Sequence, residues 1–195
     1  MTTHERELTA PVDLAGADGL RPNPDGLGWS RRPLHRDNLA PFNGRNKRWD
    51  YWAILAGERL CSVTVADLDL FVLADVWWAD LASGATGGQG VIVAPSDAPT
   101  FGAHPVVVEQ GEFCLSLAEE AARTTLSARW SDEGAARGAL EISVARPVDL
   151  ESLNVVIPWN DELFNFTSKQ WCRPAEGSLE CAAGSWTLGG SEPAW

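Results

Sequence analysis

Hydrophobic and polar residues alternate with a period of two along most of the chain beyond residue 48. At residues 140–145, for example, leucine, isoleucine and valine alternate with glutamate, serine and alanine, the pattern of a strand with one buried face. Residues 125–130 repeat this pattern. Residues 117–123, "LAEEAAR", have helix propensity, but two turns are too short to form a stable helix alone. The pattern predicts strands and no long helix.

Turn residues divide the chain into short strands. Gly57-Glu58 and the segment 67–69 separate three strands within residues 48–81. Residues 70–78 are apolar on both faces except at Asp75, which predicts a strand covered on both sides. Residues 84–90, "GATGGQG", are expected to form a flexible loop. Further strands are expected within residues 91–95, 105–113, 125–130, 139–147, 153–159, 164–171 and 178–190.

About ten short strands at hairpin spacing predict an all-β protein, either an antiparallel sandwich or a lipocalin-like barrel. Residues 1–28 are rich in Pro, Gly and Asp and are expected to form an irregular lead-in, followed by a β domain over residues 29–195. The chain stops just after a turn, at "GGSEPAW". We therefore expect a C-terminal half that completes the sheets, making this chain the N-terminal portion of a larger protein.

Composition narrows the class of partner. The net charge of -12 argues against nucleic acid and anionic membranes, because phosphate groups would be repelled. The chain has no apolar run long enough to span a membrane and no secretory signal, so we expect a cytoplasmic protein with its 4 cysteines reduced. The sequence contains no metal-binding motif and no cofactor-binding motif, so we expect the protein to bind neither a metal ion nor a cofactor.

The 10 tryptophans are the outlying feature of the composition, because Trp serves both cores and ligand-binding walls. Candidate wall residues are Trp49 and Trp52 in "KRWDYWAIL" and Trp77 in the apolar strand. On the strand at 164–170, Thr167 and Lys169 lie opposite the phenylalanine face, and Trp171 continues their set. These residues either line a ligand site or form a solvated outer face.

Four charged or ionisable residues are further candidates for binding or catalysis. Arg173 could bind a carboxylate, or it could pair locally with Glu176 to shape the turn. His35, beside Asp37, has a side chain suited to acid–base catalysis. Asp50 and Asp75 are the acidic candidates if their faces point inward, and the basic segment 31–48 could then pair with them.

Three segments carry a family resemblance: "GWSRRPLHRDNL", "KRWDYWAIL" and "NVVIPWNDELFNFTSKQWCRPAEG". From about Gly28 to its end, the chain resembles the N-terminal part of the family catalogued as domain of unknown function 2804 (DUF2804). The resemblance implies a further Trp- and Gly-rich β region beyond this chain and brings no mechanism with it. At the level of architecture, the chain is also similar to two-domain lipocalin-like proteins of the carotenoid hydratase type.

Three functions stay open at this point. The first is a module that binds an apolar small molecule between aromatic walls, with Lys169 or Arg173 meeting a polar end. The second is an enzyme that performs acid–base chemistry on a lipid- or isoprenoid-like substrate through His35, Asp50 or Asp75. The third is a structural half whose tryptophans only pack against the missing half.

Overall fold

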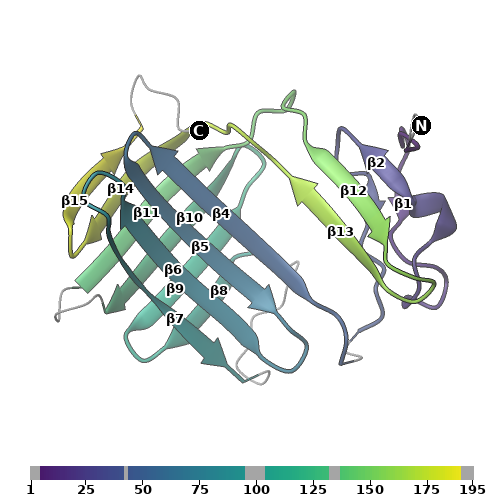
Figure 1. The fold of residues 1–195 in the computed structure, drawn as a ribbon, viewed down its shortest axis with the longest axis horizontal. Coiled ribbons are helices and arrows are strands. Elements are labelled where there is room, and N and C mark those ends of the chain that lie inside the picture. The colour runs from purple at the N-terminus through teal and green to yellow at the C-terminus, as the bar shows by residue number, and fades with distance from the viewer. Residues whose placement is uncertain (1–4, 42–43, 95–103, 132–136, 190–195) are drawn as a thin grey trace. The chain divides into compact units, whose positions relative to one another are not determined.

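The computed structural model describes residues 5–41, 44–94, 104–131 and 137–189 (Figure 1). Strands make up the regular structure of these ranges, apart from the short 3-10 helix η1 (Pro24–Gly26). The prediction of an all-β fold is confirmed. No helix in the described ranges has the length and apolar character needed to cross a bilayer.

The chain divides into two compact units. Unit 1 comprises the described residues of 1–43 and 149–171, and unit 2 those of 44–148 and 172–195. Because residues 149–171 return to unit 1, the chain enters each unit twice.

Unit 2 consists of two antiparallel sheets that pack in a sandwich-like arrangement, with no closed barrel among the described strands (Figure 1). The first sheet has the order β4-β5-β6-β7, with strands β4 (Arg48–Ala56), β5 (Arg59–Asp67), β6 (Val72–Asp80) and β7 (Ala85–Val93). The second has the order β15-β14-β11-β10-β9-β8, with strands β8 (Val106–Gln110), β9 (Phe113–Glu119), β10 (Arg123–Ser131), β11 (Arg137–Ala145), β14 (Ala175–Cys181) and β15 (Gly184–Leu188).

The core of unit 2 lies between the inner faces of these sheets. Alternate residues of each strand are buried there, including Trp78, Trp130 and Trp186. The rings of Trp78 and Trp186 meet edge to face at 5.8 Å, which joins the four-stranded sheet to the six-stranded sheet. These three tryptophans are therefore part of the packed core.

Unit 1 is smaller. It contains the antiparallel sheet β13-β12-β2 and a short parallel pair, β1 with β3. The bounds are β1 (Val12–Asp13), β2 (Gly28–Ser30), β3 (His35–Arg36), β12 (Leu153–Pro158) and β13 (Phe164–Lys169).

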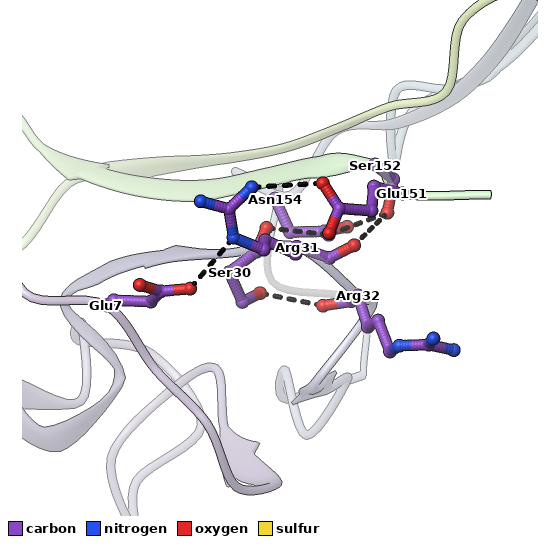
Figure 2. A network of polar contacts seen from close by, with 7 residues as sticks. All are labelled: Glu7, Ser30, Arg31, Arg32, Glu151, Ser152 and Asn154. Carbon is purple, nitrogen blue, oxygen red and sulfur yellow. Dashed lines mark hydrogen bonds and ion pairs between the residues drawn. The ribbon is translucent and has the colours of Figure 1, made fainter. Parts of the chain in front are cut away.

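A polar network joins β2 and β12 of unit 1 (Figure 2). The fully buried Asn154 donates hydrogen bonds from its side-chain amide to the backbone carbonyl of Ser30 and the hydroxyl of Ser152, and it accepts one from the hydroxyl of Ser168. The Arg31 guanidinium bridges the carboxylates of Glu7 and Glu151, at 3.2 and 3.0 Å. Asn154 thus ties together segments that are far apart in sequence, as its burial requires.

Two expectations for the four-stranded sheet are wrong. Residues 84–90 are not a loop, since Ala85–Val93 form β7, which pairs with β6 along its whole length. Gly88, at φ +134, lies so close to β6 that an added Cβ would be 2.1 Å from the Val76 carbonyl oxygen. Hydrogen bonding to β6 therefore outweighs the low strand propensity of glycine.

The apolar strand at 70–78 is also not covered on both faces. Val72, Ala74, Val76 and Trp78 of β6 are buried, but Trp77 on the opposite face is 38% exposed. The ambiguous segment 113–130 forms strands β9 and β10, as its alternation predicted.

Candidate functional site: the charged end of the unit 2 core

The inward-facing side of several unit 2 strands ends in a charged residue at the same end of the sandwich. On β9, Glu119 follows the buried residues Phe113, Leu115 and Leu117 at the next inward position. On β4, Asp50 and Trp52 precede the buried Ile54 on the same face. Alternation in a strand places such residues on one side, so the apolar core gives way to polar groups here.

Three further residues extend inward sets just outside their strands. His104 lies two positions before the buried Val106 of β8, and Arg146 lies two positions after the buried Val144 of β11. Arg173 lies two positions before Ala175, the first residue of β14, which packs against the core. We call the set Asp50, Trp52, His104, Glu119, Thr124, Arg146 and Arg173 the polar end.

Glu119 has charged neighbours on two other strand ends. Its carboxylate accepts a hydrogen bond from the Arg146 guanidinium and lies 3.9 Å from Nε2 of His104. These three side chains are 32%, 31% and 27% exposed for Glu119, Arg146 and His104, so their interactions are only partly screened by water. The Arg146 ion pair holds Glu119 in place.

Asp50 faces solvent on one side, but the protein around it excludes much of its hydration. This partial burial, followed by the negative charge of Glu119, raises the pKa of the Asp50 carboxyl, and His104 opposes the shift. No hydrogen bond to the Asp50 carboxyl is found among the described residues. Asp50 is thus a carboxyl group on the inner face of β4 whose pKa is higher than that of an ordinary aspartate.

Arg173 lies over the ring of Trp52, with 5.9 Å between its guanidinium carbon and the ring centroid. Burial, followed by the positive charge of Arg146, lowers the pKa of the Arg173 guanidinium. Its Nε is buried and has no hydrogen-bond partner among the described residues. Arg173 therefore holds a positive charge with a free donor.

Thr124 is a second buried group without a partner. It is 1% exposed, and it is the cross-strand neighbour of Glu119 on β9 and Val144 on β11, which places its side chain on the inner face at the polar end. Its hydroxyl oxygen is buried with no hydrogen-bond partner among the described residues. Buried polar groups in native proteins are nearly always paired, so both Thr124 and Arg173 call for a further partner.

In the described part of the chain, no group of three or more His, Cys, Asp or Glu residues is arranged to hold a metal ion. The cysteines are free thiols, and burial raises the pKa of Cys61 to about 12, which keeps it protonated and unreactive at neutral pH.

Comparison with known proteins gives the family. The family model for DUF2804, described as a domain of unknown function, matches residues 5–194. The chain belongs to the DUF2804 family. No curated protein and no solved structure matches the chain.

In this DUF2804 chain, the structure brings three of the predicted site residues together, namely Asp50, Trp52 and Arg173. Asp75 lies on the opposite face of the four-stranded sheet, opposite Thr64 on β5 and Gly90 on β7. Trp49 and Trp77 share that outer face and are 52% and 38% exposed. Asp50 and Asp75 therefore do not converge.

The remaining predicted residues belong to unit 1. Nε2 of His35 lies 2.9 Å from the carbonyl oxygen of Gly26, and its ring packs on Phe166 at 4.9 Å. Thr167 and Lys169 lie on β13, and Trp171 follows it as an exposed residue. Lys169 and Trp171 thus lie in a different unit from Arg173.

The basic segment 31–48 was expected to supply partners for the acidic candidates. Within this segment, Arg31 pairs with Glu7 and Glu151, and Arg36 pairs with Asp13 at 2.7 Å. These ion pairs lie within unit 1.

Sequence reasoning missed His104, Glu119, Thr124 and Arg146. The available signal was the alternation itself, because His104, Glu119 and Arg146 each lie two positions beyond a buried apolar residue of a strand. Extending each inward set by one more position would have identified them. Their convergence depends on how the strands pair, which the alternation does not specify.

Proposed function

We propose that the polar end of unit 2 binds a small amphipathic carboxylate. Arg173 meets the carboxylate, and the apolar part of the ligand lies against Trp52. The observation that carries this proposal is the pair of buried, unpartnered groups at one end of the core, Nε of Arg173 and the hydroxyl of Thr124. Leaving such groups unpaired costs free energy that a bound ligand would recover.

The charges support an anionic ligand. Arg146 is neutralised by Glu119, whereas Arg173 has no ion-pair partner among the described residues. A guanidinium pairs well with a carboxylate, and partial burial strengthens that interaction. The core below is filled by side chains, so the ligand would bind at the polar end rather than inside a lipocalin-like cavity.

Calorimetric titration of the protein with phenylbutyrate, against the neutral analogue phenylbutanol, tests this proposal. We expect phenylbutyrate to bind and phenylbutanol to bind at least about tenfold more weakly, since a charge-assisted hydrogen bond contributes about 1.5–3 kcal/mol. Arg173→Gln should weaken phenylbutyrate binding to a similar extent. Arg129→Gln, on the outer face of β10, is the matched control and should leave the affinity unchanged.

Thr124→Val removes the unpartnered hydroxyl at nearly constant volume and should also weaken binding of phenylbutyrate. Equal affinities for phenylbutyrate and phenylbutanol, or an Arg173→Gln variant that binds phenylbutyrate like the wild type, would contradict the proposal. The melting temperature of each variant shows whether a lost affinity reflects a lost fold.

A second candidate function is acid–base catalysis on such a ligand. Its support is the carboxyl pair of Asp50 and Glu119, in which burial and the charge of Glu119 raise the pKa of Asp50, and Glu119 accepts a hydrogen bond from Arg146. Proton exchange in heavy water, followed by NMR of phenylbutyrate and its oxo analogues, would detect such activity. If no deuterium enters any of these acids in the presence of the protein, the polar end acts on them only as a binding site.

A further inference from the structure

The outer face of the four-stranded sheet in unit 2 combines exposed aromatic side chains with a single charged group. We propose that this face binds a small molecule carrying a quaternary ammonium group, and that the cation lies against both the carboxylate of Asp75 and the ring of Trp77. The site lies on the side of the sheet opposite the core and shares no residue with the polar end. It is therefore independent of the carboxylate binding proposed for that end.

Strand pairing places Asp75 in the middle of this face. Asp75 lies on β6, opposite Thr64 on β5 and Gly90 on β7, and Thr64 in turn pairs with Tyr51 on β4. Side chains two positions apart on a strand share a face. All residues of these four strands are described, and Asp75 is the one charged residue among their outward positions. The face thus carries one negative charge in otherwise uncharged surroundings.

Exposed apolar side chains lie around this carboxylate. Trp77, two residues after Asp75 on β6, is 38% exposed, and Tyr51 is 60% exposed. Ile92 on β7 is 58% exposed and pairs with Leu73, two residues before Asp75. Neighbouring exposed apolar residues on one face indicate an interaction surface, whereas scattered single ones do not.

Glycines on β7 leave space beside Asp75 and Trp77. Gly90 is the cross-strand partner of Asp75, and a Cβ added to it would have its nearest neighbour, the Cβ of Asp75, at 3.7 Å. Gly88 is the partner of Trp77. The Cα atoms of Asp75 and Trp77 are about 6.5 Å apart, because the two residues are two positions apart on one strand. One small cation above these glycines can therefore contact both side chains.

Charge complementarity selects a cation for this space. No ion pair or hydrogen bond to the half-buried Asp75 side chain is found among the described residues. A partly desolvated carboxylate gains most from a partner of opposite charge, and the ring of Trp77 attracts a cation as well. The net charge of -12 also attracts cations towards the protein.

The apolar surroundings favour a quaternary ammonium over a primary one. A primary ammonium is strongly hydrated and has three donors to satisfy, whereas Thr64 is the polar cross-strand neighbour of Asp75 on this face. A quaternary ammonium has no N–H group, and its methyl groups can contact Trp77 and Ile92. Aromatic side chains are the usual means by which proteins recognise such cations.

An NMR titration of the protein with choline, against its neutral isostere 3,3-dimethylbutan-1-ol, tests this proposal at neutral pH. We expect choline to bind about fivefold more tightly, the effect of one exposed cation–π contact. The methyl protons of choline should shift upfield on binding, because they lie over an aromatic ring. Equal affinities for the two compounds would overturn the proposal.

Variants separate the charge, the space and the general electrostatic attraction. Asp75→Asn keeps the shape of the side chain and should abolish the preference for choline. Gly90→Val fills the space beside Asp75 and should weaken binding of both compounds. Glu180→Gln removes the same charge from the exposed outer face of β14 and should leave the affinity for choline unchanged.

An Asp75→Asn or Gly90→Val variant that folds and binds choline like the wild type would overturn the proposal, as would a Glu180→Gln variant that loses as much affinity as Asp75→Asn. Melting temperatures report whether each variant folds, and Trp77→Leu, which should lose the upfield shift, is a second variant at the site. Sedimentation with phosphatidylcholine vesicles distinguishes a lipid head group from a free ligand. We expect no sedimentation with the vesicles, and binding to vesicles without affinity for choline would overturn the assignment to a small molecule.

Discussion

At the scale of single residues, Asp50 shows how a strand position determines chemistry. Asp50 lies on the inner face of β4, on the same side as Trp52 and the buried Ile54. The resulting loss of hydration, and the nearby Glu119, disfavour the ionised form. Asp75, by contrast, lies on the opposite face of this sheet.

This environment predicts a pH-dependent effect of Asp50→Asn on stability. Because the pKa of Asp50 is raised in the folded state, its contribution to stability is fully present below the unfolded pKa of about 3.9 and is lost as the pH rises through the folded value. Asparagine does not ionise. The variant should therefore melt at a higher temperature than the wild type at neutral pH, and the difference should shrink towards about pH 4.

The control for this prediction is Asp75→Asn, which removes the same charge from the acidic chain at the outer face of β6. Its effect on the melting temperature reports the general relief of negative charge. An Asp50→Asn variant that melts below the wild type at neutral pH would contradict a raised pKa for Asp50.

At the scale of elements, two glycines on different strands differ in how much space surrounds them. Gly138 on β11 pairs with Trp130 on β10, and the buried indole covers the place where a side chain would be. An added Cβ at Gly138 would lie 2.0 Å from the ring. Gly90 on β7 has more room, with its nearest neighbour at 3.7 Å from an added Cβ. The need for glycine at residue 138 therefore comes from packing, not from turn formation.

Gly138→Ala should destabilise unit 2 by about 1–3 kcal/mol, because Trp130 must move within a packed core. Gly90→Ala is the matched control on a strand and should change the free energy of unfolding by less than about 0.5 kcal/mol. Urea denaturation followed by Trp fluorescence measures both variants. Equal effects of the two substitutions would show that the indole of Trp130 does not occupy this space.

At the scale of the whole molecule, the two units differ in how much apolar surface they bury. The described buried apolar residues of unit 1 are Leu14, Ala15 and Val156, whereas unit 2 contains a continuous core from ten strands. Unit 1 depends more on polar groups, above all on the hydrogen bonds of Asn154 (Figure 2). Burial of apolar surface is the main stabilising contribution in folding, so unit 2 should be the more stable part.

Hydrogen exchange measured by mass spectrometry should show this difference. Amides of β2, β12 and β13 should exchange faster than those of β5, β6, β10 and β11, because segments with few buried apolar contacts open at a lower free energy. Asn154→Leu should accelerate exchange in unit 1 and leave the β5–β6 pair unchanged. Uniform protection of the two units would contradict the view that unit 1 is the less stable one.

Much of the fold could be predicted from local pattern. Turn residues at Gly57-Glu58 and 67–69 separated three strands within residues 48–81, and alternation identified the strand at 125–130, because turn chemistry and a period of two are both local properties. Asp50 was a candidate because alternation placed it on one face with Trp52, whereas Arg173 was a candidate because a guanidinium suits a carboxylate. The glycine-rich strand β7 was not predicted, because its pairing with β6 overrides its own weak preference.

By itself, the sequence determined the all-β class, the family and the inward or outward set of most strands, because each is recorded in neighbouring residues or in motifs. Only the tertiary structure decided which strand ends meet. It brought Glu119, Arg146 and His104 together from three separate segments and placed Asp50 with them, while leaving Asp75 on the opposite face. Strand order and sheet packing depend on contacts between distant segments, and the alternation of a single strand carries no record of its partners.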